Sequence, residues 1–209
     1  MGRPRKEDSL TRQDVVAAAT ACIDKEGEAA LGVNRVAREL GIKPPAMYKH
    51  VRGNEGLRQA CAIAIWRSYL NNLDQQLAGI TEPQALLVAG AHATRNYAKQ
   101  FPARYMVMMS YQLKPSEPEE AEIIARSLQN FRDSLNLHNL SEDTLIDIMR
   151  MINAAIYGFI IREQSDLMTL RRSPDDSYEV MLEALLIATQ HIQKKDVRQA
   201  SSDHQTDHE

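Results

Sequence analysis

The most informative part of the sequence is VNRVARELGIKPPAMYKHV, which spans residues 33–51. Apolar residues recur at helical spacing over residues 33–40, and Gly41 follows at a position where glycine commonly ends a helix. A second short helix is expected over residues 44–50, because proline is tolerated in the first turn of a helix. Two short helices joined by a tight glycine turn predict a helix-turn-helix.

This helix-turn-helix has a predicted inner and a predicted outer face. We expect five apolar side chains on the inner face: Val36, Ala37, Leu40, Ile42 and Met47. The outer surface would then carry Lys43, Pro44, Pro45, Ala46, Tyr48, Lys49 and His50. Lysine, phenol and imidazole groups suit phosphate oxygens, and the second helix would project into a DNA major groove. A hairpin with only a structural role is the alternative, since this pattern alone is unspecific.

The rest of the chain is also predicted to be helical, with no alternating strand pattern. Hydroxyl residues followed three positions later by an acid or amide mark several helix starts, such as Thr11-Arg-Gln-Asp14 and Thr81-Glu-Pro-Gln84. Ser141-Glu-Asp-Thr144 marks another, with two acids in the first turn of the helix. About nine helices are expected: 11–26, 33–40, 44–50, 54–78, 82–100, 103–111, 119–137, 142–165 and 174–194. The sequence therefore predicts an all-α fold.

The predicted organisation has four parts. A basic arm (residues 1–8) precedes a three-helix DNA-binding domain (9–53), a helical ligand-binding and dimerisation bundle (54–195) and a polar tail (196–209) that we expect to be disordered. The net charge is −3, but residues 1–60 hold 11 Lys and Arg against 8 Asp and Glu, and the remainder holds 14 against 20. A basic N-terminal module thus precedes an acidic body.

Other classes of protein find little support in the sequence. It contains no uncharged apolar run of transmembrane length and no secretory signal, which predicts a cytoplasmic protein without a membrane partner. It has no zincin motif, nucleophile set or phosphate loop, so we expect no catalytic residue, metal or cofactor. Cys22 and Cys61 are expected to be small core residues, with a redox switch as the alternative. A helical interaction protein remains a further alternative.

Residues 33–51 resemble the DNA-binding signature of the TetR family of bacterial transcription regulators. That signature combines an aliphatic-Ala pair, a glycine turn and a recognition helix that ends in Tyr-x-His or Tyr-x-Tyr before an apolar residue. Val36-Ala37, Gly41 and Tyr48-Lys-His50 occupy these positions. The resemblance implies a homodimer that binds a palindromic operator in double-stranded DNA. It also implies a repressor that a small apolar or amphipathic ligand releases, although a regulator without an effector remains the alternative.

The resemblance also implies roles for individual residues near the N-terminus. Base edges would be contacted by Asn34, Pro45, Ala46 and Lys49. Phosphates would be contacted by Lys43, Tyr48, His50, Arg52 and Arg58. Arg3, Arg5 and Lys6 resemble a basic arm that enters the minor groove, with a solvated charge cluster as the alternative.

Two departures from the family pattern lie beside this motif. Asn54 stands where the family commonly has a lysine that contacts a phosphate. Gly32 and Val33 stand where it often has a hydroxyl that caps a helix and touches a phosphate. Arg52 and Arg58 are expected to supply the charge that Asn54 lacks.

The C-terminal body offers candidates for an effector site and for a dimer seam. Methionine and tyrosine suit irregular apolar cavities, and polar groups within apolar helices need partners, although an ordinary core explains both equally well. The expected ligand-binding residues are His92, Tyr105, Met108, Met109, Asn153 and Tyr157. The last two helices are apolar on more than one side and need a further partner surface. The expected dimer residues are Ile152, Ala155, Ile156, Phe159, Met181 and Leu185.

Overall fold

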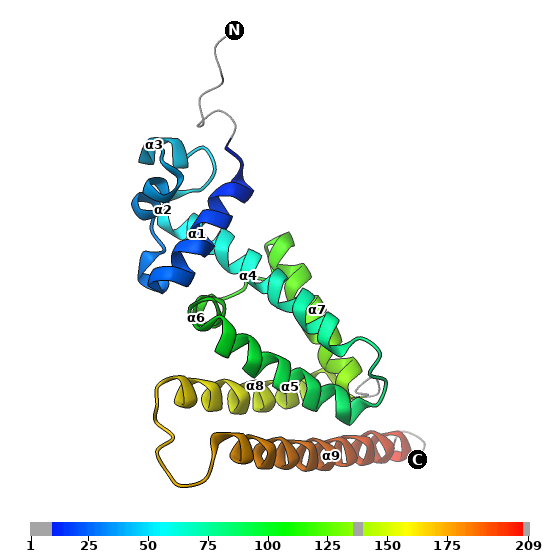
Figure 1. Cartoon of the computed structure of the whole chain (residues 1–209). Coiled ribbons are helices and arrows are strands. Elements are labelled where there is room, and N and C mark those ends of the chain that lie inside the picture. Colours follow the sequence, from blue (N-terminus) through cyan, green and yellow to red (C-terminus); the bar gives the residue numbers. More distant parts are fainter. Residues whose placement is uncertain (1–9, 136–139, 207–209) are drawn as a thin grey trace. The chain divides into compact units, whose positions relative to one another are not determined.

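The computed structural model describes residues 10–135 and 140–206, with the side chains of residues 134 and 197–206 left aside. Within these ranges the chain is almost entirely helical and has no strand, which confirms the predicted all-α class (Figure 1). The helices are α1 (Arg12–Glu26), the 3-10 turn η1 (Glu28–Ala30), α2 (Val33–Leu40), α3 (Pro44–Met47), α4 (Gly53–Leu77), α5 (Pro83–Gln100), α6 (Pro102–Ser110), α7 (Pro118–Leu135), α8 (Glu142–Gln164) and α9 (Pro174–Thr206).

Side-chain caps account for several of the helix starts. Thr11 and Asp14 form a reciprocal capping box at α1, in which Thr11 Oγ1 accepts the Asp14 N–H at 3.1 Å and Asp14 accepts the Thr11 N–H at 2.9 Å. Ser141 caps α8 by accepting the Thr144 N–H at 3.3 Å. Both caps were predicted. At α5 the carboxylate of Glu82 accepts the first N–H groups of the helix, one residue after the predicted hydroxyl.

Two helices differ from their predicted lengths. Helix α3 ends at Met47, and residues 48–50 form a turn instead of continuing the predicted helix to 50. Helix α9 continues to Thr206, so the prediction of a disordered tail from residue 196 is wrong for 196–206. Extending an existing helix adds one hydrogen bond per residue and needs no new nucleus, which allows a polar sequence to stay helical. Residues 207–209 lie outside the described chain.

The chain divides into two compact units. Unit 1 comprises Met1–Asn72 and Tyr97–Ile124, and unit 2 comprises Leu73–Asn96 and Ala125–Glu209. Helices α4, α5 and α7 each contribute residues to both units. The first part of α4 and all of α6 thus belong with the N-terminal helices. The functional division at residue 53 stays a prediction.

The core of unit 1 forms where α1 packs against α2 and α6, and α2 packs against α3. Four of the five predicted inner-face residues of the helix-turn-helix are buried, and Leu40 is half-buried. Cys22 and Cys61 are also buried. Burial raises the pKa of both thiols, that of Cys61 to about 12. Because the thiolate is the reactive form, these cysteines behave as small apolar core residues.

A fully buried carboxylate, that of Glu120, joins α4 to the start of α7 within unit 1. Its Oε1 accepts hydrogen bonds from Gln59 Nε2 at 2.7 Å and from the Tyr111 hydroxyl at 3.0 Å. Its Oε2 accepts the Lys114 N–H at 2.7 Å. Burial favours the neutral acid, but these hydrogen bonds outweigh it and hold the pKa of Glu120 below its ordinary value. The hydrogen bonds of the fold therefore stabilise the ionised carboxylate of Glu120.

A buried guanidinium, that of Arg95, joins α5, α8 and α9 within unit 2. Arg95 Nε donates to Glu163 at 2.8 Å, and its terminal nitrogen lies 2.7 Å from Asp175. The guanidinium carbon lies 4.6 Å from the centroid of the Tyr178 ring and 5.5 Å from that of Phe159. Helices α8 and α9 run side by side next to this cluster (Figure 1). The charge is thus paired and covered by aromatic rings, as a buried arginine requires.

Helix α8 is long and apolar enough to cross a membrane by length and composition, with a mean hydropathy of 1.5 over its most apolar window. One face packs inside unit 2 through five buried residues: Leu145, Ile148, Ile152, Ile156 and Ile160. Another face, with Asn153, Ala154 and Tyr157, is exposed. A single such helix is weak support for a membrane span, because a helix with two apolar faces in a water-soluble protein has the same composition.

We predict that Glu120→Gln lowers the free energy of unfolding by about 2–4 kcal/mol at pH 7, because an amide has one acceptor oxygen for three donors. The surface change Glu122→Gln, which affects only an exposed ion pair with Arg67, is the control and should cost at most about 1 kcal/mol. Urea unfolding measures both values.

The same pair of variants gives a pH test. The lowered pKa of Glu120 means that its stabilisation is complete above the unfolded-state value of about 4.3 and is lost as the pH falls below it. The difference in the free energy of unfolding between the wild-type protein and Glu120→Gln should therefore become smaller below pH 4. If Glu120→Gln and Glu122→Gln lower the free energy of unfolding equally at pH 7, the ionised Glu120 carboxylate does not stabilise the fold in this way.

Candidate nucleic-acid interface

The turn between α2 and α3 is closed by backbone hydrogen bonds around Gly41. Gly41 has a φ of 69°, in the left-handed region that glycine adopts without steric cost. The Ile42 N–H donates to the Ala37 carbonyl at 3.0 Å, and the Gly41 N–H donates to that of Arg38 at 3.1 Å. The side chain of Ile42 returns to the core. These bonds fix where α3 begins relative to α2.

The residues predicted to contact DNA lie on accessible surface after this turn and at the start of α2. Tyr48 is 62% exposed and does not pack against Trp66, whose ring contacts that of Tyr69 edge-on with the centroids 5.8 Å apart. Among the other predicted residues, Asn34, Lys43, Pro45, Lys49 and Arg52 are exposed, and Ala46 and His50 are half-buried. A side chain must be accessible to contact a base or a phosphate, and these side chains are. Their roles in binding DNA stay predictions.

Most of the basic side chains that the structure describes in unit 1 fall into two groups. One group is ion-paired within the unit: Arg12 with Glu119, Lys25 with Glu39, Arg35 with Glu26 and Glu39, Arg58 with Glu28, Arg67 with Glu119 and Glu122, and Arg104 with Asp24. The other group lies around the helix-turn-helix and comprises Arg38, Lys43, Lys49 and Arg52. In the part of the chain that the structure describes, no ion pair involves this second group.

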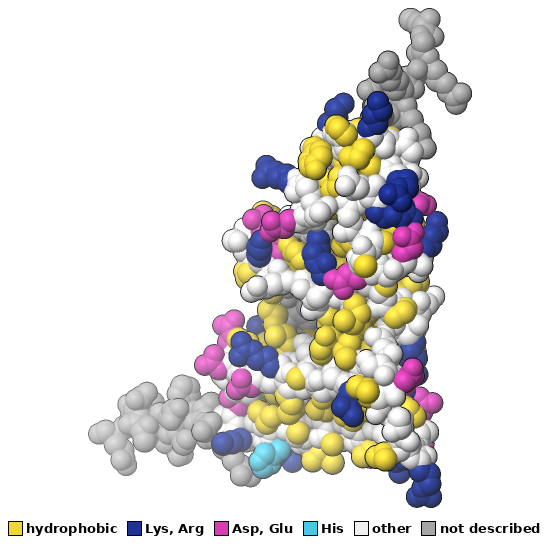
Figure 2. Space-filling model, turned by 90° about the vertical axis from the view of Figure 1, so that its left-hand side faces the viewer, with side chains coloured by type: hydrophobic (Ala, Val, Ile, Leu, Met, Phe, Trp, Pro, Cys, Tyr) yellow, Lys and Arg dark blue, Asp and Glu magenta, His cyan; other side chains and the backbone are white. Residues whose placement is uncertain are grey.

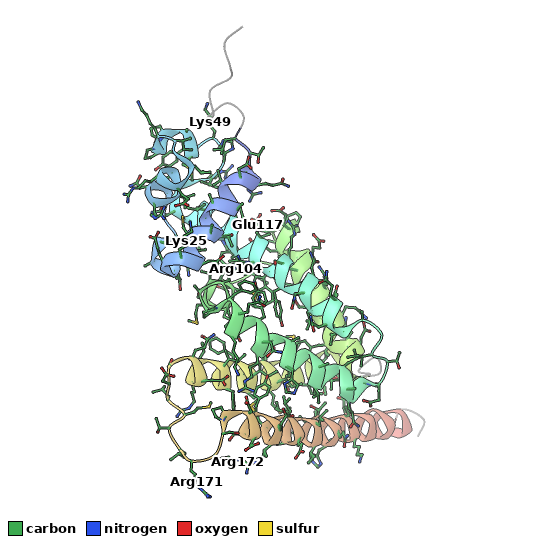
Figure 3. All side chains as sticks on the ribbon, in the orientation of Figure 1. Lys25, Lys49, Arg104, Glu117, Arg171 and Arg172 are labelled. Carbon is green, nitrogen blue, oxygen red and sulfur yellow. The ribbon has the colours of Figure 1, made fainter. Side chains whose placement is uncertain are left out.

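Lys49 of the unpaired group and Lys25 of the paired group lie at different places in unit 1. Figure 3 shows Lys49 beside α3, well apart from Lys25 at the C-terminal end of α1. Figure 2 shows Lys and Arg side chains around small hydrophobic groups on the surface of the N-terminal helices. The helix-turn-helix therefore presents uncompensated positive charge, the electrostatic feature of a surface that binds phosphates.

Two arginines, one predicted to contact phosphates and one not, require separate comment. Arg58 donates to the carboxylate of Glu28 and to Ser110 Oγ, the latter at 2.9 Å. Because these contacts hold its guanidinium inside unit 1, we leave Arg58 out of the interface. Arg38 is exposed one turn before Gly41, and sequence reasoning did not select it. The predicted minor-groove arm, with Arg3, Arg5 and Lys6, lies outside the described residues.

Asn54 makes a contact that the sequence did not reveal. Its Oδ1 accepts the N–H of Val33 at 2.9 Å, across 21 positions of sequence. The first residue before α2 is Gly32, which has no side chain to cap the helix. The two departures from the family pattern, one at Gly32 and Val33 and the other at Asn54, are therefore connected by the hydrogen bond from the Val33 N–H to Asn54.

The six predicted ligand-binding residues do not form one site within either unit. Tyr105 and Met108 are buried in unit 1, and Met109 is half-buried there. In unit 2, His92 lies 3.2 Å from Glu179. Asn153, which we expected to be buried among apolar residues, is exposed on α8, as is Tyr157. The expectation for Asn153 is wrong because α8 packs through neighbouring residues on its other face.

Unit 2 contains a cavity of about 200 Å³ that none of these six residues lines. It lies among the start of α5, the end of α7 and α9, and its lining includes Glu82, Gln84, Leu135, Leu186, Thr189 and Gln193. Over residues 10–135 and 140–206, no group of three or more His, Cys, Asp or Glu side chains is arranged to hold a metal ion.

The predicted dimer residues are only partly available on the surface of the chain. Ile152, Ile156 and Leu185 are buried inside unit 2 and contact the chain's own core. Ala155, Phe159 and Met181 are half-buried. The apolar pattern of α8 and α9 covers two faces and does not reveal which one faces inward, so the sequence did not show that these three residues lie in the chain's own core. The dimer itself stays a prediction. Among the described side chains of these helices, the exposed apolar ones are instead Ala154, Tyr157, Val180, Ala184 and Ile187.

Comparison with known proteins gives consistent results. The family model "Tetracyclin repressor-like, C-terminal domain" matches residues 87–185. The chain is 30% identical over 169 residues to the HTH-type transcriptional regulator Rv0681 of Mycobacterium tuberculosis, covering 80% of this chain and 75% of that relative.

Solved structures share the fold at low sequence identity. A TetR variant of Acinetobacter baumannii in complex with minocycline has a TM-score of 0.68 at 15% identity, over 88% of this chain and 99% of that one. Apo ActR of Streptomyces coelicolor has a TM-score of 0.69 at 14% identity, over 89% and 97%. Together with the relative and the family model, these likenesses confirm the resemblance seen at residues 33–51. The chain belongs to the TetR family of transcriptional regulators.

Proposed function

We propose that this regulator binds operator DNA through the helix-turn-helix face of unit 1. The observation that carries the proposal is the sorting of its charges. Arg38, Lys43, Lys49 and Arg52 surround the helix-turn-helix without ion pairs among the described residues, while six other basic side chains of the unit are paired. Leaving charges uncompensated on one surface favours a polyanion such as DNA.

The residues of this face divide between phosphates and bases. Lys43, Tyr48, His50 and Arg52 flank α3 and are proposed to contact phosphates, which positions the protein without reading sequence. Base edges are proposed to be contacted by Pro45 and Ala46 of α3, by Lys49 after it and by Asn34 of α2. A lysine suits guanine O6 and N7, and an asparagine suits adenine N6 and N7. The basic arm would add contacts in the minor groove.

The exposed apolar faces of α8 and α9 are proposed as the seam of a homodimer. Val180 is 52% exposed and Ile187 68%, and they lie seven residues apart, on the same face of α9. With Ala154 and Tyr157 of α8 they form an apolar surface that a second copy would cover. Such a seam also explains why α8 is apolar on two faces. A two-fold dimer matches palindromic half-sites about 34–36 Å apart.

We further propose that a small apolar or amphipathic ligand binds unit 1 and releases the operator. Trp66, Tyr69, Tyr97 and Phe101 form a series of ring contacts with centroids 5.2–5.8 Å apart. The buried Trp66 Nε1 has no acceptor among the described residues, so a ligand oxygen or nitrogen would satisfy it. Helix α4 carries Trp66 and begins at Gly53, directly after the helix-turn-helix, so displacing this helix would move the recognition surface.

A solved structure of the same fold supports control by a ligand only by analogy. The Acinetobacter baumannii TetR variant of the same fold is seen in complex with minocycline. A repressor that responds only to its own abundance is the alternative, and a helical interaction protein without DNA is the other.

Lys43→Ala is predicted to weaken binding to every duplex by a similar factor and to reduce the slope of log K against log salt by about 0.9. The cause is the loss of one phosphate contact and its released counterion. Lys25→Ala removes the same charge from a lysine that is paired with Glu39 on another part of unit 1, and it should leave the slope unchanged. Equal slopes for the two variants would contradict the proposed surface.

Lys49→Ala is predicted to relax sequence preference at one base pair of each half-site, at a cost of about 1–3 kcal/mol of discrimination. Competitive selection from randomised duplexes measures the preference. If the selected sequences are the same for Lys49→Ala and the wild-type protein, Lys49 does not read a base.

Ile187→Glu is predicted to raise the dimer dissociation constant at least about 100-fold, because an unpaired charge would enter an apolar seam. Leu170→Glu is the matched control, since Leu170 is 87% exposed in the connection between α8 and α9 and outside the seam. Sedimentation analysis measures both. A dimer that persists in Ile187→Glu would place the interface elsewhere.

An effector is predicted to bind less tightly when operator is present, because coupling between two sites is reciprocal. Trp66 is the chain's only tryptophan, so its fluorescence reports on α4 directly. Titration of apolar and amphipathic compounds with and without operator should give dissociation constants that differ about 5- to 150-fold. If a compound binds with the same dissociation constant with and without operator, its site is not coupled to the DNA-binding site.

A further inference from the structure

We propose that Asn54 is a positioning residue for DNA recognition: it caps α2 from the start of α4 and thereby holds the first turn of α2 in place. The inference rests on the proposed DNA-binding function. It assigns Asn54 a role that differs from a phosphate contact, the role that a lysine would have at this position.

The need for an external cap arises at Gly32. The first N–H groups of a helix have no acceptor within the helix, and a side-chain oxygen of the preceding residue commonly satisfies one of them. Gly32 precedes α2 in an extended conformation (φ −147°, ψ 143°) and has no side chain. Asn54 Oδ1 accepts the Val33 N–H at 2.9 Å instead. A Cβ on Gly32 would lie 4.0 Å from this oxygen, so the Asn54 amide occupies the space beside the helix start.

This hydrogen bond connects two parts of the proposed interface. Asn34, the proposed base-reading residue of α2, directly follows Val33, whose N–H is bound. Arg52, a proposed phosphate ligand, lies two residues before Asn54. Because the bond ties the two backbone segments together, the register between a base contact and a phosphate contact depends on it.

The two departures from the family pattern then compensate each other. A lysine at position 54 has no acceptor and could not cap α2, whereas an asparagine has an acceptor and carries no charge for a phosphate. With glycine at position 32, the chain needs the cap from α4. Lys43 and Arg52, which have no ion pairs among the described residues, supply the phosphate charge.

The first measurement is hydrogen exchange of the free protein. Asn54→Ala should raise the exchange rates of the Val33 and Asn34 amides about 2- to 30-fold, which is the population change expected when one cap is lost. Amides in the middle of α1 should be unchanged. Asn54→Asp keeps the acceptor oxygen and should retain the protection.

The second measurement is competitive selection of duplex DNA. Asn54→Ala should relax preference at the base pair read by Asn34 and leave the slope of log K against log salt unchanged, because no charge is lost. Gly32→Ser provides a rescue, since a serine hydroxyl can cap α2 and the extended backbone accepts any residue. A serine at position 32 accepts from the second or third N–H of α2, so the double variant Gly32→Ser/Asn54→Ala should regain base preference and amide protection at residues 34 and 35.

Each result decides one part of the proposal. Unchanged amide exchange in Asn54→Ala would overturn the cap. Faster exchange with unchanged base preference, or a rescue of exchange that does not restore preference, would overturn the positioning role. A salt slope that falls by about 0.9 would show a phosphate contact through a neighbouring charge instead. If the wild-type protein binds no duplex, the proposed function fails, and the exchange measurements still decide whether the cap exists.

Discussion

The left-handed turn at Gly41 is the constraint on which the candidate interface depends. A side chain with a Cβ at this φ would cost about 1–2 kcal/mol, so glycine makes the abrupt exit from α2 inexpensive. The hydrogen bond from Ile42 to Ala37 then returns the chain to the core, and Pro44 opens α3 after a single intervening residue. The closeness of α2 and α3 and the exposure of Tyr48 and Lys49 follow from this geometry.

Each compact unit contains a buried charge that is paired with groups of the same unit. In unit 1 the carboxylate of Glu120 has three donors from α4 and from the connection between α6 and α7. In unit 2 the guanidinium of Arg95 has two carboxylates and two aromatic rings. A paired buried charge adds little net stability over an apolar substitute, but it allows few alternative arrangements of the helices around it. Both charges therefore act mainly to fix how the helices of one unit meet.

Local sequence patterns predicted most of the fold and the accessible part of the interface. The capping box at Thr11, the end of α2 at Gly41 and the exposure of Lys43, Tyr48 and Lys49 each depend on residues within a few positions of one another, which sequence patterns report well. The cap from Asn54 was missed because its partner is 21 residues away.

Features that depend on packing could not be read from the sequence. The apolar pattern of α8 fits two faces, so it did not distinguish Ile152, which is buried, from Tyr157, which is exposed. Arg58 was grouped with the phosphate ligands by type and position, whereas its partners Glu28 and Ser110 come from other elements. The helical extension of α9 beyond residue 194 depends on the preceding helix rather than on its own polar composition.

Hydrogen exchange of the wild-type protein with and without random-sequence duplex DNA at low salt tests the central claim most directly. Binding through the uncompensated charges of the helix-turn-helix predicts slower exchange in residues 33–54 when DNA is present, with the protection lost as salt is raised. It also predicts no salt-dependent protection by DNA in α8 and α9. Protection confined to unit 2, or no protection at any salt concentration, would contradict a DNA-binding role for this surface.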